Sequence, residues 1–373
     1  MSSALFFVGC CNRPLGYVAK PAGKGISAFR LDLGSGRVDP LGVTEGIDNP
    51  TFVAVAPDGI SLAAVSEVGG WNEGDITAYG IDYDSGALTY LSKQPTLGDG
   101  TAHNAYDTTG RFAGIANYSG LPAAARPNQS IAVYPCERDG TLRPSVAAMR
   151  HRGTGPNAAR QERPHAHCIR WTPDNRFVVV ADLGIDRLVI YQFDAESGAL
   201  APHGELLMPP GSGPRHFLFH PTLPFAYCVN ELTSELASLS FDAAAGRFAL
   251  LSVEPTTSQN VPNNSGSAIA LAAGGKHLYV GNRGDDSIAG FAIDQRSGRA
   301  SLMGTTPCGG RVPRDFAFDP TGSVLVVANQ ESDVLTLFRY VAESGDLEPL
   351  GQPVPSGSPT AIAFHPVVGG GSP

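Results

Sequence analysis

Charge is scarce in this sequence, and long apolar runs are missing from it. Only 16% of the 373 residues are Asp, Glu, Lys or Arg, whereas 42% are hydrophobic. This balance favours a folded chain with a large core over a disordered one. No apolar run approaches the ~20 residues of a membrane-spanning helix. The opening residues, MSSALFFVGCC, lack the basic segment of a secretory signal. These absences predict a cytoplasmic protein that has no membrane partner.

Positive charge is the scarcer of the two signs, and paired cysteine motifs are missing. Lys and Arg number 26 against 35 Asp and Glu, so the net charge is −9, which argues against nucleic acid as a partner. No C-x-x-C motif occurs; Cys10 and Cys11 are adjacent, and Cys168 and Cys228 lie in apolar runs. Free, buried thiols in a reducing compartment are the better interpretation. We expect no cofactor and no metal.

No long stretch has helical periodicity; short apolar runs alternate with turns instead. One unit reads NPTFVAVAPDGISLAAVSE and then GDITAYGIDYDSGALTYLS, and another reads VPRDFAFDPTGSVLVVANQ and then SDVLTLFRYVAESGDLEPLG. Runs of about five to eight residues that are rich in Val, Ile, Phe and Ala and bounded by turn residues are strand signals. Each unit therefore predicts four strands.

The first strand of each unit opens with a residue that can be aligned by its distance to the following turn. These opening residues are Thr51, His103, His167, Arg215, Ser267, Arg314 and Thr360. The intervals run from 46 residues (Arg314 to Thr360) to 64 residues (His103 to His167), which is the period of a four-stranded propeller blade. The longest interval contains two segments that look like loop insertions, 121–129 and 149–163.

The seventh unit has one strand at the C-terminus, and the N-terminus supplies the missing three. A blade built from both ends would close the ring and remove exposed sheet edges. We therefore predict an all-β fold, a seven-bladed β-propeller with four-stranded antiparallel blades. It forms one domain over residues 1–373, with 368–373 as a flexible tail.

In a propeller the first strands line the central channel, so their opening residues should form a ring at one mouth. A second ring should follow from the ends of the second strands, where the aligned pairs are Ser66-Glu67, Asn117-Tyr118, Asp182-Leu183, Asn230-Glu231, Asn282-Arg283, Asn329-Gln330 and Cys10-Cys11. A recurring Asn or Asp most simply caps a strand end. The second member varies in chemical type, which is expected where a functional site occupies one position of a repeat.

The two rings select a set of candidate site residues. They are His103, His165, His167, Arg215 and Arg314 from the first ring and its flank, and Glu67, Glu231 and Arg283 from the second ring. Each also has a structural interpretation: Arg215 could simply pair with Glu231, and His165 could support the turn at Pro164. Arginines that converge on one mouth of an acidic chain indicate recognition of carboxylate or phosphate.

The motifs RQERPHAH, PPGSGPRHFLFHP, VNEL, NRGDDSIAGFAID and VPRDFAFDPTG resemble those of the lactonase family of seven-bladed propellers. That family includes propeller-type 6-phosphogluconolactonases and the 3-carboxy-cis,cis-muconate lactonizing enzymes. The resemblance covers about residues 4–366. It implies a catalytic set of His167, Arg215, Glu231 and Arg283, with His103, Arg314, Glu67 and His165 left as substrate-binding candidates. The stretch GCCN at residues 9–12 departs from the G-T-Y-T-like start of many relatives.

The resemblance implies hydrolysis of an anionic sugar lactone, 6-phosphogluconolactonase-like, by a monomer or homodimer that has a small-molecule lactone or carboxylate as its partner. Arginines would hold the anion and polarise the carbonyl. His167, titrating near neutrality, would transfer protons, with Glu231 as its orienter or as base through water.

Three other interpretations stay open. One is lactonisation of a carboxymuconate-like diacid by the same residues. A second is metal-assisted hydrolysis through oxygen ligands, which would be drawn from Glu67, Asp182, Asn117, Asn230 and Asn282. The third is a non-catalytic propeller that serves as a protein-binding scaffold.

Overall fold

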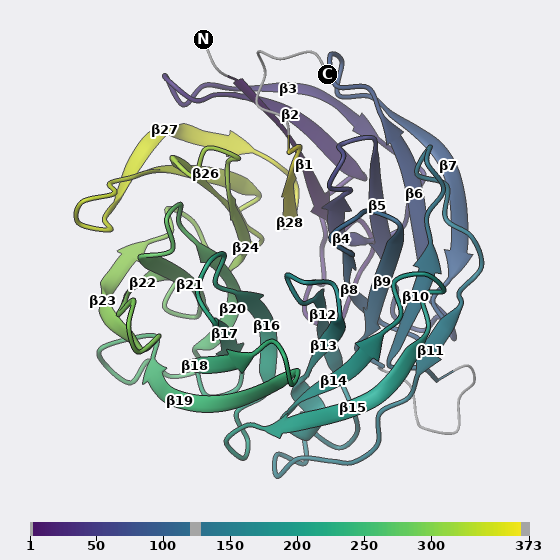
Figure 1. The fold of residues 1–373 in the computed structure, drawn as a ribbon. Coiled ribbons are helices and arrows are strands. Elements are labelled where there is room, and N and C mark those ends of the chain that lie inside the picture. Colours follow the sequence, from purple (N-terminus) through teal and green to yellow (C-terminus); the bar gives the residue numbers. More distant parts are fainter. Residues whose placement is uncertain (1–2, 120–127, 367–373) are drawn as a thin grey trace.

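Seven four-stranded antiparallel sheets stand around a common centre (Figure 1). The computed structural model describes residues 3–119 and 128–366; the proposed tail at 368–373 and most of the first loop insertion lie outside this range. In six sheets the strands follow one another in chain order from the centre outward, and in the seventh the last strand of the chain lies inside the first three. The innermost strands of neighbouring sheets are in contact. The predicted all-β, seven-bladed propeller with four-stranded blades is confirmed.

The blades are numbered by the order of their inner strands. From the centre outward, blade 1 contains β4 (Pro50–Val55), β5 (Ser61–Ser66), β6 (Asp75–Ile81) and β7 (Leu88–Pro95); blade 2 contains β8 (Thr101–Tyr106), β9 (Phe112–Asn117), β10 (Ile131–Pro135) and β11 (Ala147–Met149); and blade 3 contains β12 (Ala166–Trp171), β13 (Phe177–Asp182), β14 (Arg187–Phe193) and β15 (Leu200–Leu207). Blade 4 contains β16 (Pro214–Phe219), β17 (Phe225–Asn230), β18 (Glu235–Asp242) and β19 (Arg247–Pro255), and blade 5 contains β20 (Ser265–Leu271), β21 (His277–Arg283), β22 (Ser287–Ile293) and β23 (Ala300–Pro307). Blade 6 contains β24 (Pro313–Phe318), β25 (Val324–Asn329), β26 (Val334–Tyr340) and β27 (Leu347–Pro355), and blade 7 contains β28 (Pro359–Phe364), β1 (Ser3–Cys10), β2 (Ile26–Asp32) and β3 (Val38–Thr44). A short 3-10 helix, η1 (Leu183–Ile185), follows β13.

The hydrophobic core is divided among the interfaces between blades. Strand β13 illustrates the reason: Val178 and Val180 pack with side chains of blade 2, whereas Phe177, Val179 and Ala181 pack with side chains of blade 4. Successive side chains of a strand point to opposite faces, so a sheet between two others is apolar on both faces. Each of the seven pairs of adjacent blades holds one such cluster.

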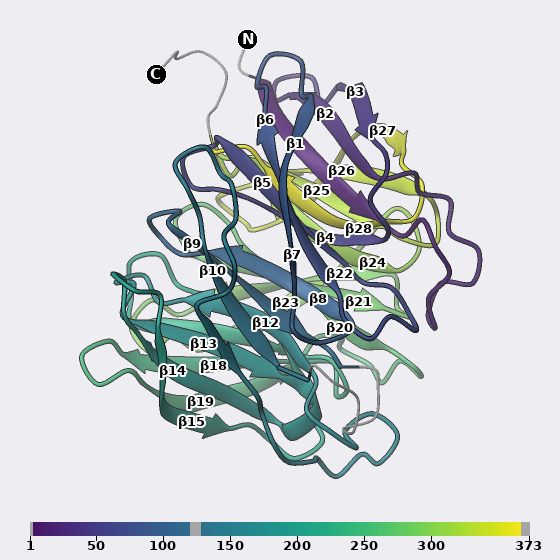
Figure 2. The same cartoon turned by 90° about the vertical axis from the view of Figure 1, so that its right-hand side faces the viewer.

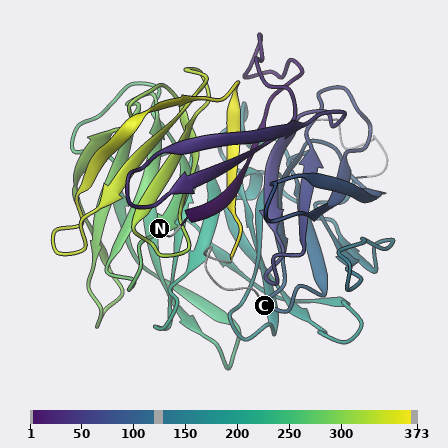
Figure 3. The same cartoon turned by 90° about the horizontal axis from the view of Figure 1, so that it is seen from above.

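Blade 7 joins the two ends of the chain. Strand β28 is innermost and pairs antiparallel with β1, with Phe6 opposite Phe364 and Val8 opposite Ile362. In Figure 2 the labels β28 and β4 lie side by side where blade 7 meets blade 1, and Figure 3 shows the yellow C-terminal strand beside the purple N-terminal strands. The Phe6 ring also stacks on Phe29 at 5.3 Å. The predicted closure by both ends is confirmed.

Deleting the chain after Gly357 should leave a protein that aggregates and melts at lower temperature. The deletion removes β28, so it exposes the edge of β1 and uncovers the apolar side chains that β28 covers. The matched control ends at Pro366 and keeps every strand. Thermal unfolding and size-exclusion chromatography of both proteins measure the effect. A soluble monomer with unchanged melting temperature after deletion at Gly357 would contradict the role of closure.

Every inner strand has a break in its pairing register where it begins. Between Ala166 and Cys168, for example, one residue of β12 has no opposite partner on β13. Such a bulge leaves the extra residue unpaired and re-aims its side chain. The first residues after the break are Thr51, Ala102, His167, Arg215, Ser267, Arg314 and Thr360, and in blades 4 and 5 the next residue, His216 or Ala268, is also left out of the register. The predicted alignment is therefore right in six blades and wrong by one residue in blade 2, where Ala102 takes the place assigned to His103.

Candidate active site

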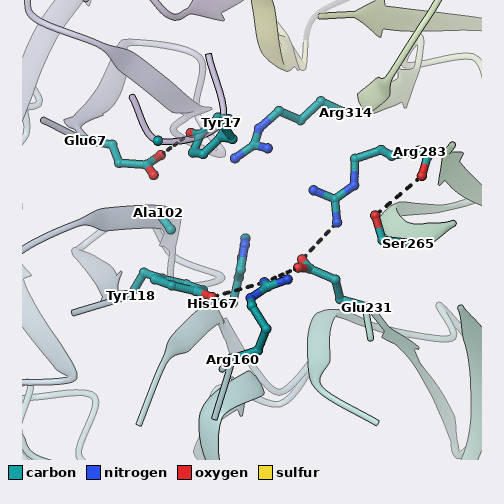
Figure 4. Close-up of a pocket in the computed structure, with 11 residues that line it drawn as sticks. Tyr17, Glu67, Ala102, Tyr118, Arg160, His167, Glu231, Ser265, Arg283 and Arg314 are labelled. Atoms are coloured by element: carbon teal, nitrogen blue, oxygen red, sulfur yellow. Dashed lines mark hydrogen bonds and ion pairs between the residues drawn. The ribbon is translucent and has the colours of Figure 1, made fainter. Parts of the chain in front are cut away.

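One mouth of the channel holds an open cavity of ≈ 330 Å³ (Figure 4). Its walls come from the bulged starts of the inner strands, the residues just after the second strands, and two loops. The lining residues are Gly16, Tyr17, Glu67, Ala102, Tyr118, Arg160, His167, Glu231, Ser265, Arg283 and Arg314. Five of the eight candidate residues lie in this wall: His167, Arg314, Glu67, Glu231 and Arg283.

Glu231 is the centre of the charged cluster on one side of the cavity. Its Oε1 pairs with Arg160 Nη2 at 2.6 Å, and its Oε2 pairs with Arg215 Nε and with Arg283 Nη2, both at 2.9 Å. Glu231 is only 4% exposed, and a buried carboxylate of this kind requires partners. Three arginines surround one carboxylate, so this wall carries a net positive charge. Each of these arginines is held by its ion pair with Glu231.

The environment sets the protonation states of the two candidate proton-transfer groups. Burial opposes ionisation of Glu231, but the guanidinium groups of Arg283, Arg215 and Arg160 outweigh it and hold its pKa well below the usual value. Burial and the neighbouring Arg215 lower the pKa of His167 well below its usual value. At neutral pH, Glu231 is therefore a carboxylate and His167 a neutral imidazole. The expectation that His167 titrates near neutrality is wrong, because burial of the ring and the neighbouring Arg215 disfavour its charged form.

The opposite wall combines an aromatic ring, a carboxylate and one more arginine. Tyr17, from the loop between β1 and β2, donates its hydroxyl to Glu67 Oε2 at 2.9 Å. The guanidinium of Arg314 lies over the Tyr17 ring, 4.1 Å from its centroid. Within the described part of the chain Arg314 has no carboxylate within salt-bridge distance. Figure 4 shows this arginine across the cavity from Glu231, and its charge is free to meet a ligand.

Three predicted site residues lie behind the cavity wall. Arg215 is 2% exposed and lies beneath Glu231, where it also donates to the Ser267 carbonyl at 2.6 Å. His165 stacks on Tyr118 with ring centroids 4.3 Å apart and contacts the Tyr118 carbonyl through Nδ1. The pair with Glu231 matches the structural interpretation of Arg215. The ring of His165 contacts Tyr118 and Glu162, and its support of the turn at Pro164 stays a prediction.

His103 is the third residue behind the wall. It lies one layer down the channel, where its ring packs 4.1 Å from that of Phe52 and 5.5 Å from that of His216. Burial, with help from the nearby Arg170, holds the pKa of His103 well below its usual value. The side chain is buried, and the bulge at Ala102 turns it away from the cavity.

Arg160, Tyr118 and Tyr17 also line the cavity, although the sequence did not single them out. Arg160 comes from the loop between β11 and β12, which is the second predicted insertion, and its Nη2 donates to the Tyr118 hydroxyl at 3.2 Å. Two signals pointed toward them: Arg160 opens the RQERPHAH motif, and Tyr118 occupies the same repeat position as Glu231. No repeat position predicted Tyr17, because it lies in the loop where the chain departs from GTYT-like relatives.

The recurring Asn and Asp of the second ring serve mainly as caps. Asn117 Nδ2 donates to the carbonyls of Thr96 and Gln129, and Asn282 Nδ2 donates to that of Thr256. The predicted capping role is confirmed for these two. Asn230 differs, because neither its amide nitrogen nor its oxygen has a hydrogen-bond partner among the residues described. In that same part of the chain no group of three or more His, Cys, Asp or Glu is placed to hold a metal ion.

All six cysteines are free, and five of them are buried, with Cys136 half-buried. The predicted free thiols are confirmed.

No helix among the described residues has the length and apolar character to cross a membrane.

Comparisons with known proteins agree with this architecture. The chain is 36% identical over 354 residues to a protein of Bacillus subtilis (strain 168) named 6-phosphogluconolactonase, and the match covers 94% of this chain and 98% of that protein. A protein of Formosa agariphila with the same name is 29% identical to this chain, and the match covers 90% of this chain and 94% of that protein. The solved structure of a periplasmic gluconolactonase from Pseudomonas aeruginosa superposes with a TM-score of 0.88 at 32% identity, covering 98% of this chain and 99% of that one. The family described as "Lactonase, 7-bladed beta-propeller" matches residues 6–364. The chain therefore belongs to the lactonase family of seven-bladed β-propellers.

Proposed function

We propose that this protein hydrolyses an anionic sugar lactone of the 6-phosphogluconolactone type in the cavity at the propeller mouth. The observation that carries the proposal is the arrangement of charge. A neutral, buried His167 lies beside a carboxylate that is held by three arginines, and Arg314, which has no ion pair among the described residues, faces them across the cavity of ≈ 330 Å³. The proposal is also supported by the names of relatives that the chain matches over nearly its whole length.

His167 would act as the base of the first step. A neutral imidazole accepts a proton from water as the water oxygen bonds to the lactone carbonyl carbon, and the carbonyl oxygen becomes an oxyanion. Arg283 and Arg160 are the donors available to stabilise that oxyanion. Because Glu231 holds both, they do not have to reorganise when charge develops. The ring carbon–oxygen bond then breaks, and the imidazolium returns its proton to the leaving alkoxide, giving a hydroxy acid.

Glu231 would position the arginines instead of accepting the proton. Its low pKa and its three ion pairs make it a weak base, and its removal would free the guanidinium groups to move. This role differs from the two that the sequence suggested for it, orienter of His167 and base through water, because its ion pairs are with arginines. Arg215 would act through Glu231, since it lies beneath the cavity.

Arg314 would hold the anionic group of the substrate. A guanidinium binds phosphate through paired hydrogen bonds, and Tyr17 keeps this one flat against its ring. Glu67 is the acceptor on the same wall for sugar hydroxyls. Lactonisation of a carboxymuconate-like diacid would use the same cations, but it has no separate support from the relatives named above.

The test compares two lactones that differ in one phosphate. With 6-phosphoglucono-δ-lactone, Arg314→Ala should raise KM by roughly 10–100-fold, the worth of a charge-assisted hydrogen bond, and leave kcat within about twofold. With unphosphorylated glucono-δ-lactone the same variant should change neither constant by more than about twofold. Arg311→Ala is the matched control, since Arg311 is exposed and outside the cavity.

Two results would count against the proposal. Equal losses on both lactones would mean that Arg314 supports the fold of the site and does not bind phosphate. No hydrolysis of either lactone by the wild-type protein, together with turnover of a carboxymuconate, would replace lactone hydrolysis with the reverse chemistry.

A further inference from the structure

A second cleft lies on the same face as the main cavity. It has a volume of ≈ 260 Å³, and its lining includes Arg150, Arg152, Arg163, His151 and Ser130. We call it the arginine cleft. A wall separates it from the main cavity: Glu162 lines the cleft, contacts His165 Nε2 at 3.3 Å, and His165 in turn stacks on Tyr118. The two spaces are thus neighbours that have no lining residue in common.

His151 lines the cleft and has a buried ring nitrogen that lacks a hydrogen-bond partner among the described residues. Its side chain is 2% exposed, and its Nδ1 donates to Asp182 Oδ2, whose side chain is fully buried. The other carboxylate oxygen of Asp182 accepts from the backbone N–H groups of His165 and Gly184 at 2.7 and 3.0 Å. With Nδ1 held by Asp182, Nε2 faces away from it, and Nε2 has no hydrogen-bond partner among the residues described.

The pair of Asp182 and His151 is not needed to anchor the loop, because other blades anchor theirs without it. Blades 2 and 5 have Asn where blade 3 has Asp182, and the amide there satisfies backbone carbonyls. In blade 3 the carboxylate instead orients an imidazole from the loop between β11 and β12. A buried imidazole with a free nitrogen leaves a polar group unsatisfied, which costs stability unless a ligand or water completes it.

The arginines make the cleft cationic in a chain whose net charge is −9. Arg150 and Arg152 are both exposed, and within residues 3–119 and 128–366 neither has a carboxylate within salt-bridge distance. Arg163 pairs with Glu162 at 2.8 Å. Three guanidinium groups and one carboxylate around a small cleft give a surplus of positive charge, which suits a compact anion.

We propose that the arginine cleft is a second ligand site, separate from the main cavity, and that it binds the phosphate group of a small molecule. Arg150 and Arg152 would meet the phosphate oxygens from the rim, and Arg163 would add a third guanidinium from the lining. The volume is below the usual range for drug-sized ligands, about 300–1,000 Å³, so the cleft suits a head group and leaves the rest of the molecule in solvent. The inference does not rest on lactone hydrolysis.

Isothermal titration calorimetry at constant ionic strength tests the site, with the full-length Arg314→Ala protein as background so that the main cavity contributes less. Inorganic phosphate should bind to this background. Adding Arg150→Gln and Arg152→Gln should weaken the binding by roughly 10–100-fold, since each lost charge-assisted hydrogen bond is worth about 1.5–3 kcal/mol. Adding Arg138→Gln and Arg247→Gln, two exposed arginines outside the cleft, is the matched control and should change the affinity less than twofold.

A phosphate monoester, glucose 6-phosphate, is titrated in parallel. Tighter binding of the monoester would identify a phosphorylated metabolite as the ligand, and equal affinity would identify free phosphate; both support the site. The proposal is overturned if the background protein binds neither, or if the cleft variant and the control bind phosphate equally. Loss of lactone hydrolysis has no bearing on these titrations, so a failure of the proposed function remains distinguishable from a failure of this site.

Discussion

Replacing His167 by asparagine should lower kcat by roughly 10²–10⁴, the usual worth of a general acid–base group, and leave the melting temperature nearly unchanged. His167 is the bulged residue of β12, and the equivalent position holds Thr51, Arg215 and Thr360 in other blades. The backbone there accepts polar side chains of several sizes, so asparagine should fold. Lactone hydrolysis and thermal unfolding of the same preparation measure both effects.

The pH profile separates proton transfer from packing at this position. Burial and Arg215 hold the pKa of His167 well below its usual value, so the neutral base persists through neutrality. The wild-type kcat/KM should be flat around pH 7 and fall only in acid, where His167 becomes protonated; the asparagine variant should lack this acid limb. A stable His167→Asn protein that has wild-type turnover would end the assignment of this histidine as the base.

Replacing Glu231 by glutamine should have the largest effect on stability, a loss of about 3–5 kcal/mol in the free energy of unfolding. Glutamine keeps the shape but removes the charge that compensates Arg215 and Arg283, whose side chains are 3% and 14% exposed. Turnover should fall as well, because these arginines lose the group that orients them. Denaturant unfolding and kcat/KM on the phosphorylated lactone provide the two measurements.

The control is Glu205→Gln, which breaks the exposed pair with Arg187 and should cost less than about 1 kcal/mol. The pKa of Glu231 in the folded state is depressed, so its contribution is present above the unfolded pKa and is lost only as the pH falls through the folded value. The gap between wild type and Glu231→Gln should therefore persist from pH 5 to 9 and close in acid. Equal losses for Glu231→Gln and Glu205→Gln would show that the buried cluster contributes no more than a surface pair.

The sequence by itself determined the repeat, the number of blades and the closure by both ends. These follow from local rules: strands alternate their side chains, turns need Gly and Asp at set places, and an unfinished unit leaves an edge that must be paired. The same register also predicted that His167 and Arg314 from the first ring, and Glu231, Arg283 and Glu67 from the second, would face one mouth. Side chains at the same position of the repeat point the same way in every blade, so the repeat spacing is enough to predict which of them face the same mouth.

Only the tertiary structure decided which of these groups meet a ligand and in what state of charge. The one-residue bulge that places Ala102 in the cavity wall and His103 behind it depends on pairing between β8 and β9, and spacing alone does not reveal it. Arg160 reaches Glu231 across 71 residues of sequence through a loop, and loop paths follow no period. The low pKa of His167 arises from burial beneath neighbouring blades and from Arg215 on the next inner strand. The burial of a side chain and the charges around it depend on residues from several blades, so both are set only when the ring has closed.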